Sequence, residues 1–171
     1  YRFFDNPKVS PELIMEPHFL STELRCENHE TIIAIQDTSV LDFSRHVKTS
    51  GLGLSGVGND GHEFSGLHFH ATLALTEKGL PLGLFDYQMW SRERQKAQGH
   101  DLVKLPIEKK ESFRWIKSLR ETAKRTSKSK VIVVADREAD IYDLFEEALD
   151  RGVDLVIRLN HEIGKSTRLN S

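Results

Sequence analysis

Two runs of apolar residues stand out in the pattern of hydrophobic and polar positions along the chain. Residues 32–35 are all apolar and lead through Gln36 into Asp37, and residues 131–135 are all apolar and lead into Asp136. Continuous apolar runs of this length, rich in β-branched residues, are typical of strands buried on both faces. We therefore predict strands over residues 31–37 and 131–136, each delivering a carboxylate at its C-terminal end.

A different pattern fills the middle of the chain. Residues 66–76 alternate between apolar and more polar positions, which is typical of a half-buried strand. A turn at residues 77–79 separates them from a third predicted strand at 81–90, so the two strands form a hairpin. The composition of residues 51–66 and 92–106 favours loops, and residues 153–159 form a last predicted strand.

Two stretches carry the helical period. Residues 111–125 place four apolar residues on one side and basic residues on the other (Trp115, Ile116, Leu119 and Ala123). Residues 141–151 form a second predicted helix, with Asp140 as its N-cap and Gly152 just past its end. Residues 1–26 look irregular, although Ser10 and Pro11 could start a short helix. The order β-β-β-α-β-α-β predicts an α/β fold with a mixed sheet.

Composition narrows the class of protein. The chain has 171 residues, of which 38% are hydrophobic and 29% charged, as expected of a soluble globular domain. No apolar run approaches the length of a membrane span. The single cysteine, Cys26, excludes an internal disulfide and a cysteine-based zinc cluster, and fits a reducing compartment.

Charge is distributed unevenly. The net charge is −2, yet residues 104–130 carry ten basic residues against three acidic ones. This segment is either the solvated face of a helix or a surface that contacts phosphates, and the sequence leaves both interpretations open.

The two strand-end acids are the main candidates for chemistry. If their strands are parallel neighbours, about 4.8 Å apart, Asp37 and Asp136 lie close together at one edge of the sheet. Two carboxylates this close repel each other, and a divalent cation such as Mg²⁺ relieves the repulsion. Such a site suits phosphoryl chemistry. Either residue alone could instead be an ordinary turn aspartate.

Several motifs resemble those of one enzyme family. IQDTS at residues 35–39 and ADREADIY at 135–142 resemble the two acidic motifs of the DDE transposases of the IS4 group, closest to Tn5-type transposases. YRFFDNPKVS at residues 1–10, and LPLGL at 80–84 leading to Met89 and Trp90, resemble further segments of that group. The resemblance covers nearly the whole chain up to His161, and the second acidic motif is its most specific part.

The resemblance implies a ribonuclease-H-like fold, incomplete here at the C-terminus, in which Asp37 and Asp136 are the first two catalytic, metal-binding acids. It implies Mg²⁺, or Mn²⁺, as the cofactor and double-stranded DNA as the partner, at both transposon ends and target. In the full protein water would cut a phosphodiester at the transposon end, and the released 3′-OH would attack the opposite or target strand. A synaptic homodimer in a bacterial cytoplasm, associated with the nucleoid, is also implied.

This sequence departs from the family's pattern in one respect. The family's third acid is a glutamate in a YxxRxxxE motif, which the chain lacks, and Glu162 comes too early to replace it. We therefore expect this chain to be inactive, or nearly so, alone. A non-catalytic DNA-binding remnant of a transposase and a stand-alone nuclease of the same fold are the alternative interpretations.

Other side chains near these motifs have two interpretations each. Arg137, Arg92 and Arg94 are candidate DNA contacts, but Arg137 could instead pair with Glu138 or Asp140. For Glu138, a salt bridge is favoured over a role in supporting a metal ligand. Trp90 could line a DNA groove or the core. His68 and His70 share a strand face, and without a third ligand in sight a structural role is favoured.

The predicted organisation has three parts. Residues 1–28 are a linker or the end of a preceding helical region, and residues 29–161 are a partial ribonuclease-H-like catalytic core. Residues 165–171 match the translation of a common sequencing-adapter sequence. We therefore expect residues 162–171 to be a non-native tail.

Overall fold

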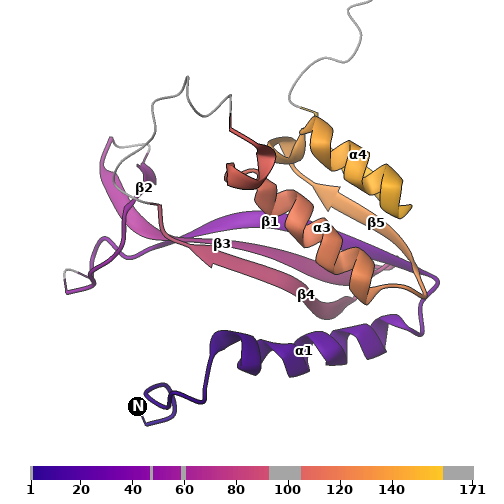
Figure 1. Cartoon of the computed structure of the whole chain (residues 1–171), viewed down its shortest axis with the longest axis horizontal. Coiled ribbons are helices and arrows are strands. Elements are labelled where there is room, and N and C mark those ends of the chain that lie inside the picture. The colour runs from indigo at the N-terminus through magenta and orange to yellow at the C-terminus, as the bar shows by residue number, and fades with distance from the viewer. Residues whose placement is uncertain (1, 47, 59–60, 93–104, 160–171) are drawn as a thin grey trace, which may run out of the picture.

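The computed structural model describes residues 2–46, 48–58, 61–92 and 105–159. One helix and four consecutive strands are followed by alternating helices and strands, which resembles the order that the sequence predicts (Figure 1). The strands are β1 (Thr31–Asp42), β2 (Leu54–Val57), β3 (Glu63–Thr76), β4 (Pro81–Trp90), β5 (Lys130–Ala135) and β6 (Asp154–Ile157). The helices are α1 (Pro11–Cys26), α3 (Phe113–Arg125) and α4 (Tyr142–Arg151), with short 3-10 turns η1 (Ile107–Lys109) and η2 (Arg137–Ala139).

One mixed sheet of six strands organises the fold. Its order is β2-β3-β1-β5-β6, and β4 also pairs with β3. β3 is antiparallel to β1, β2 and β4, whereas β1, β5 and β6 are parallel. Three meandering strands followed by parallel strands joined through helices form a ribonuclease-H-like α/β sheet, so the predicted fold class is confirmed. β1 is the strand at which the antiparallel and parallel halves meet.

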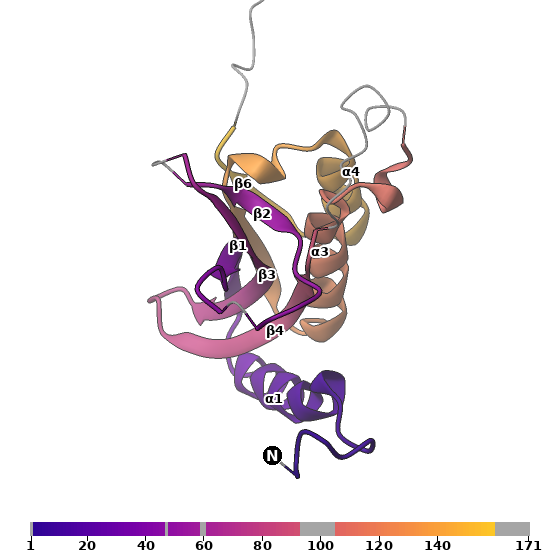
Figure 2. The same cartoon turned by 90° about the vertical axis from the view of Figure 1, so that its left-hand side faces the viewer.

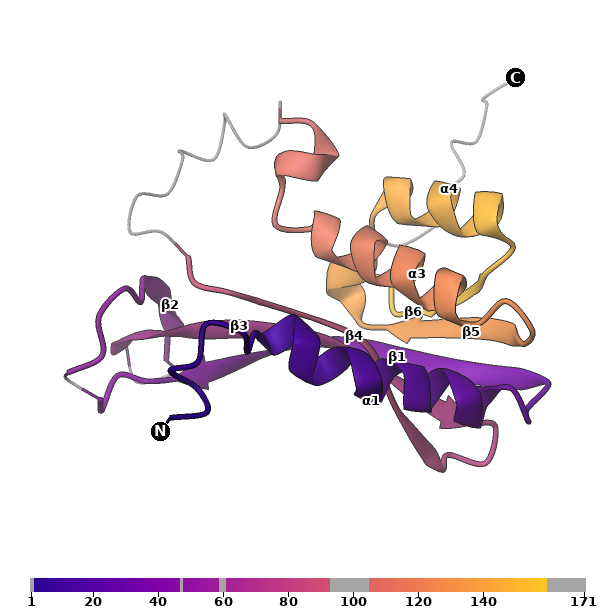
Figure 3. The same ribbon diagram turned by 60° about the horizontal axis from the view of Figure 1, so that its bottom comes forward.

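The core lies between one face of this sheet and two helices. α3 and α4 both lie over that face (Figure 3). There Trp115, Leu119 and Leu144 belong to one buried cluster with Ile32 and Val133. The opposite face carries no helix within the described part of the chain, and apolar side chains such as Ile35 and Val156 are 38% and 57% exposed there. None of the described helices is both long and apolar enough to cross a membrane.

α1 lies along β4, at the edge of the sheet (Figure 2). The backbone N–H of Leu84 donates to His18 Nε2 at 2.9 Å, and Arg25 Nε donates to the carbonyl of Leu82 at 2.5 Å. These contacts satisfy backbone groups that an open edge strand would otherwise leave unpaired. Gly83 makes the approach possible, because a Cβ there would lie 2.2 Å from Thr22 Oγ1.

The prediction of irregular structure is therefore wrong for residues 11–26. Ser10 Oγ accepts the N–H of Leu13 at 3.2 Å as an N-cap, and Pro11 follows in the first turn, as the sequence suggested. The helix nevertheless continues for 16 residues with Pro17 inside it. Tertiary packing of its buried side chains on the sheet outweighs the local cost of that proline. The division at residues 28 and 29 stays a prediction, and the suspected tail lies outside the described residues.

Three boundaries differ from the predicted ones. β2 and the start of β3 form a hairpin inside the predicted loop at 51–66. β1 continues five residues beyond Asp37 because it keeps pairing with β3 after it leaves β5. Asp140 is not the cap of α4, since Ile141 occupies that position in extended conformation and the capping carboxylate is Asp136, on η2. Gly152 ends α4 in left-handed conformation, as predicted.

Candidate functional site

The register of two parallel strands decides where the two candidate acids lie. β1 and β5 pair Ile33 with Ile132 and Ile35 with Val134. The pairing ends there; if the same register is continued by two residues, it sets Asp37 opposite Asp136. Neighbouring strands are about 4.8 Å apart, and paired residues of parallel strands project from the same face. Both acids are exposed, so each carboxylate is open to solvent.

The segment after β5 fixes the backbone around Asp136. Its Oδ1 accepts the N–H of Glu138 at 2.9 Å, which caps η2. Ala139 at the end of this turn is fully buried in the core and anchors it. A carboxylate has about four acceptor positions, so this cap leaves room for further ligands.

Arg114, on α3, contacts the segments that follow both acids. Its Nε donates to Thr38 Oγ1 at 3.0 Å, one residue after Asp37. Its Nη2 donates to Glu138 Oε2 at 2.6 Å, two residues after Asp136. Its Nη1 donates to the carbonyl of Glu111 at 3.0 Å. Sequence reasoning missed this role of Arg114, which no local pattern marks among the basic residues of its helix.

Two indole rings and a histidine complete the surroundings of this arginine. The guanidinium carbon of Arg114 lies 5.2 Å from the ring centre of Trp115 and 5.8 Å from that of Trp90. His70 Nδ1 is hydrogen-bonded to Thr38 Oγ1 at 2.8 Å, and its ring meets Trp115 edge to face. Burial, together with the positive charge of Arg114, lowers the pKa of His70 to about 3. His70 is therefore a neutral part of the core at physiological pH.

His68 lies on the same buried face. Its ring stacks on Trp90, with ring centres 5.3 Å apart. Burial lowers the pKa of His68, and the charge of Arg92 acts in the same direction. Both histidines and Trp90 are thus placed in the packing between β3, β4 and α3, which agrees with the structural role favoured for the histidines.

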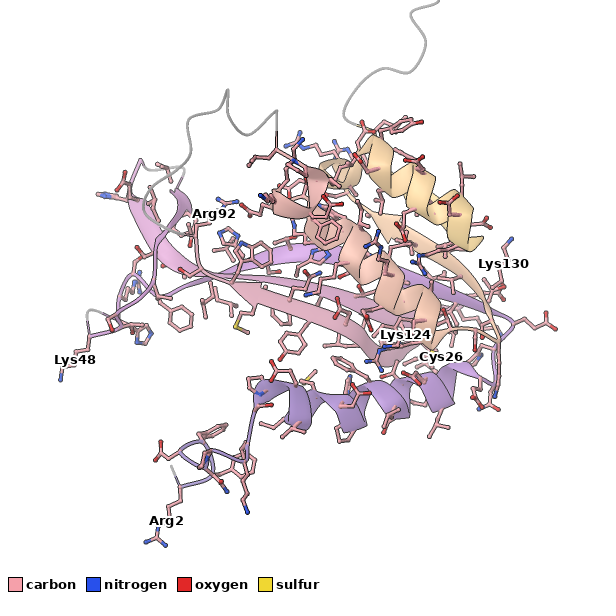
Figure 4. All side chains as sticks on the ribbon, in the orientation of Figure 1. Arg2, Cys26, Lys48, Arg92, Lys124 and Lys130 are labelled. Atoms are coloured by element: carbon pink, nitrogen blue, oxygen red, sulfur yellow. The ribbon has the colours of Figure 1, made fainter. Side chains whose placement is uncertain are left out.

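The predicted DNA-contacting arginines differ in their surroundings. Arg92 holds both carboxylate oxygens of Glu111 and donates from Nη1 to the carbonyl of Ser55 at 3.0 Å, beside β2 (Figure 4). To contact phosphate it would have to give up these partners. Arg137 is exposed on η2, next to Asp136. Its suggested partner Glu138 pairs instead with Arg114, and Arg94 lies outside the described residues.

The basic segment that includes α3 is largely paired within the protein. Arg120 binds Glu147 on α4, Arg125 binds Glu16 and Glu23 on α1, and Lys128 binds Glu27. Lys124 and Lys130 also have acidic partners. The basic side chains of this surface therefore mainly form ion pairs between elements, rather than an unneutralised surface for binding phosphates.

A wide groove on the surface does not include the two acids. This groove of about 1630 Å³ runs between α1, β4 and the start of α3, and neither Asp37 nor Asp136 lines it. Its charged residues are of both signs, including Glu12, Glu16 and Lys117. Asp37 and Asp136 are instead exposed, outside this groove.

The chemistry of the acid pair fits a hard divalent cation in part. Carboxylate oxygens are the ligands that Mg²⁺ prefers, and this ion commonly keeps several waters. Within the described residues, no group of three or more histidine, cysteine, aspartate or glutamate side chains could hold a metal ion. The metal site predicted at Asp37 and Asp136 therefore lacks a third ligand of these types among the described residues.

Comparison with known proteins gives only distant similarities. No protein-family model matches the chain. It aligns with the catalytic domain of Mos1 mariner transposase (9% identity, TM-score 0.37) and with a pre-cleavage Mos1 transpososome (11% identity, TM-score 0.31). Both alignments cover 92% of this chain, which spans 66% and 45% of those two chains. Similarities this distant identify neither the fold nor the family of this chain. The fold class is therefore based on the strand order, and membership of the IS4 group stays a prediction from the sequence.

Proposed function

We propose that this chain is part of the catalytic core of a DDE transposase of the IS4 group, which cuts and joins DNA at transposon ends. One observation supports the proposal: β1 and β5 are parallel neighbours, and their register, continued by two residues past Ile35 and Val134, brings together Asp37 and Asp136, the two acids of the motifs that resemble that group. A ribonuclease-H-like sheet and an open, exposed acid pair are consistent with it.

In the proposed reaction Asp37 and Asp136 would bind Mg²⁺ or Mn²⁺ and hold it against the scissile phosphate. A divalent cation at this place would neutralise charge on the phosphate and favour attack by water or a 3′-OH. The protein's own contribution is to keep two like charges side by side on a rigid sheet. The parallel pairing of β1 and β5 brings the two strand ends together, so neither end has to be moved into place when DNA arrives.

The first test is metal binding by the chain itself. We expect Mn²⁺ to bind, and Asp37→Asn or Asp136→Asn to weaken binding by at least about tenfold, since each removes a ligand charge. Titration of Mn²⁺ followed by electron paramagnetic resonance of the free ion measures this. Asp150→Asn, which changes an exposed acid on α4, serves as the matched control. Equal affinity of the wild type and both site variants would refute the assignment.

The second test is DNA cleavage by a protein extended downstream to supply a third acid. Either asparagine substitution is expected to abolish Mg²⁺-dependent cleavage while leaving DNA affinity nearly unchanged, because the acids bind metal rather than phosphate. An extended protein that still cuts DNA with either asparagine would place the active site elsewhere.

The alternative function is a non-catalytic DNA-binding remnant. It is favoured by the finding that the described residues provide two acids and no cluster of three. Such a remnant would bind DNA with an affinity that falls steeply as salt rises, and would cut it with neither Mg²⁺ nor Mn²⁺. Binding and cleavage measured on the same DNA therefore separate the two functions.

A further inference from the structure

Arg114, on α3, donates hydrogen bonds to both β1 and η2. Thr38 directly follows Asp37, and Glu138 both follows Asp136 and donates its N–H to that carboxylate. One guanidinium therefore joins the two chain segments that carry the acids, from the helix-covered side of the sheet.

The position of Arg114 is itself closely fixed. All three guanidinium nitrogens donate hydrogen bonds, to Thr38, Glu111 and Glu138. The side chain is only 11% exposed, whereas that of Glu138 is 59% exposed. A planar guanidinium flanked by two indole rings has little freedom to reorient, so it acts as a rigid spacer.

We infer that Arg114 is a positioning residue that holds β1 and η2 together and so sets the separation of Asp37 and Asp136. The sheet alone does not do this, because the β1–β5 pairing ends at Ile35 and Val134, two residues before the acids. Beyond that point Arg114 is hydrogen-bonded to both segments. This role in metal binding rests on the proposed function, but the mechanical link itself does not.

Lysine cannot replace arginine in this role. Its compact ammonium group lacks the planar fork that reaches Thr38 and Glu138 together, although it keeps the positive charge. Arg114→Lys therefore separates geometry from charge. Glu138→Gln breaks the same link from its exposed end, and a substitution at an exposed side chain leaves the core intact.

The same helix provides a matched control. Arg120 binds Glu147 on α4 through Nε and Nη2, at 2.9 and 2.7 Å, and touches neither acid-bearing segment. Arg120→Lys and Glu147→Gln therefore break a comparable ion pair elsewhere. Any general loss of stability should appear in the control pair as well.

The experiment measures amide hydrogen exchange and Mn²⁺ affinity in the whole chain. We expect Arg114→Lys and Glu138→Gln to speed exchange selectively at residues 138–140, and to weaken Mn²⁺ binding by about tenfold, as is typical when a partner behind a metal ligand is lost. The control variants are expected to change neither quantity at this site.

Each outcome decides one part of the inference. Exchange at residues 138–140 that matches the control variants would overturn the link. Faster exchange there with unchanged Mn²⁺ affinity would overturn the claim that the link sets the spacing of the acids. If the wild-type chain binds no Mn²⁺, the proposed function fails, and the exchange data still decide whether Arg114 joins the two segments.

Discussion

Several individual polar side chains are buried in the core of this protein. The helix-covered face of β1 and β3 includes Gln36, His68, His70 and Thr72, all nearly or fully buried. Among these, His70 has a hydrogen-bond partner in Thr38, which in turn accepts from Arg114. A polar layer beneath α3 thus lies directly behind the strand that presents Asp37, and its protonation state affects stability.

His70 should make the fold sensitive to acid. Its folded-state pKa is about 3, whereas an unfolded histidine has a pKa of about 6.5. Between these values the unfolded state binds the additional proton, so stability is lost as pH falls below about 6.5, by up to about 1.4 kcal/mol per pH unit. We expect His70→Gln to have a flatter profile of unfolding free energy between pH 4 and 7.

Urea denaturation at several pH values measures the effect, with His46→Gln, at an exposed position after β1, as the control. The important quantity is the slope with pH, because His70→Gln can lower stability at every pH by disturbing the packing. Parallel profiles for the wild type and His70→Gln would contradict the prediction.

At the scale of elements, α3 connects the other parts of the fold. Its buried side packs on the sheet, and its three best-paired arginines reach different elements: Arg114 binds β1 and η2, Arg120 binds α4, and Arg125 binds α1. The ion pair with α4 also lowers the pKa of Glu147 to about 2, chiefly through the hydrogen bond from Arg120. The positive charge of this segment, for which the sequence left a solvated helix face and a phosphate-contacting surface open, joins elements through these ion pairs.

The packing of α1 on β4 depends on one glycine. Gly83 has a φ of +137° and its α-hydrogen side faces Thr22, so Gly83→Ala meets both backbone strain and a steric clash. We expect a loss of roughly 2 kcal/mol or more in unfolding free energy. Amide exchange in α1 should rise with it.

Gly79→Ala is the matched control, because Gly79 also has a positive φ but no atom within 4 Å of an added Cβ. It should cost about 1 kcal/mol, from the backbone alone. Equal losses for the two variants would show that the contact with α1 contributes nothing.

The hydrophobic pattern could predict most strands, but not every element. Buried strands need apolar runs wherever they lie, so β4, β5 and their order follow from the sequence. β2 is short and Gly56 interrupts it, so the apolar signal is too weak to distinguish it from a loop. α1 contains Pro17, which argues against a helix, and its stability comes from contacts with β4 that local sequence does not contain.

Like the fold, the candidate site could be predicted only in part from the sequence. Asp37 and Asp136 follow apolar runs whose parallel pairing could be anticipated, so their proximity was expected. Arg114 was not, since its partners Thr38 and Glu138 are 76 and 24 residues away in the sequence. Asp140 is of a residue type that often caps helices, but a 3-10 turn precedes α4. The capping carboxylate is that of Asp136, at the start of this turn.

Across the whole molecule, one residue unites the edge helix with the helical layer. Arg125 on α3 is 11% exposed, binds Glu16 and Glu23 on α1, and lies 4.8 Å from the ring centre of Phe19. Lys124 and Cys26 lie at the same end of the molecule (Figure 4). The helical layer and the edge helix therefore meet around this guanidinium.

Removing Arg125 should loosen α1 from the rest of the fold. We expect Arg125→Met to lower the unfolding free energy by roughly 2 kcal/mol, because it removes a nearly buried charge with two partners and a ring contact. Lys124→Met, at a side chain 71% exposed with one weak partner, should change it by less than about 0.5 kcal/mol. Urea denaturation of both variants tests this, and equal effects would argue against the prediction.

The position of α1 at the edge of the sheet also determines when this helix can dock during synthesis. α1 leaves the ribosome before every strand, yet its hydrogen-bond partners in β4 come 57 and 66 residues later. A helix of 16 residues is marginally stable alone in water, so α1 must wait for the β3–β4 hairpin before it can dock. Contacts of such long sequence separation form late. Loss of this docking should therefore speed unfolding far more than it slows folding.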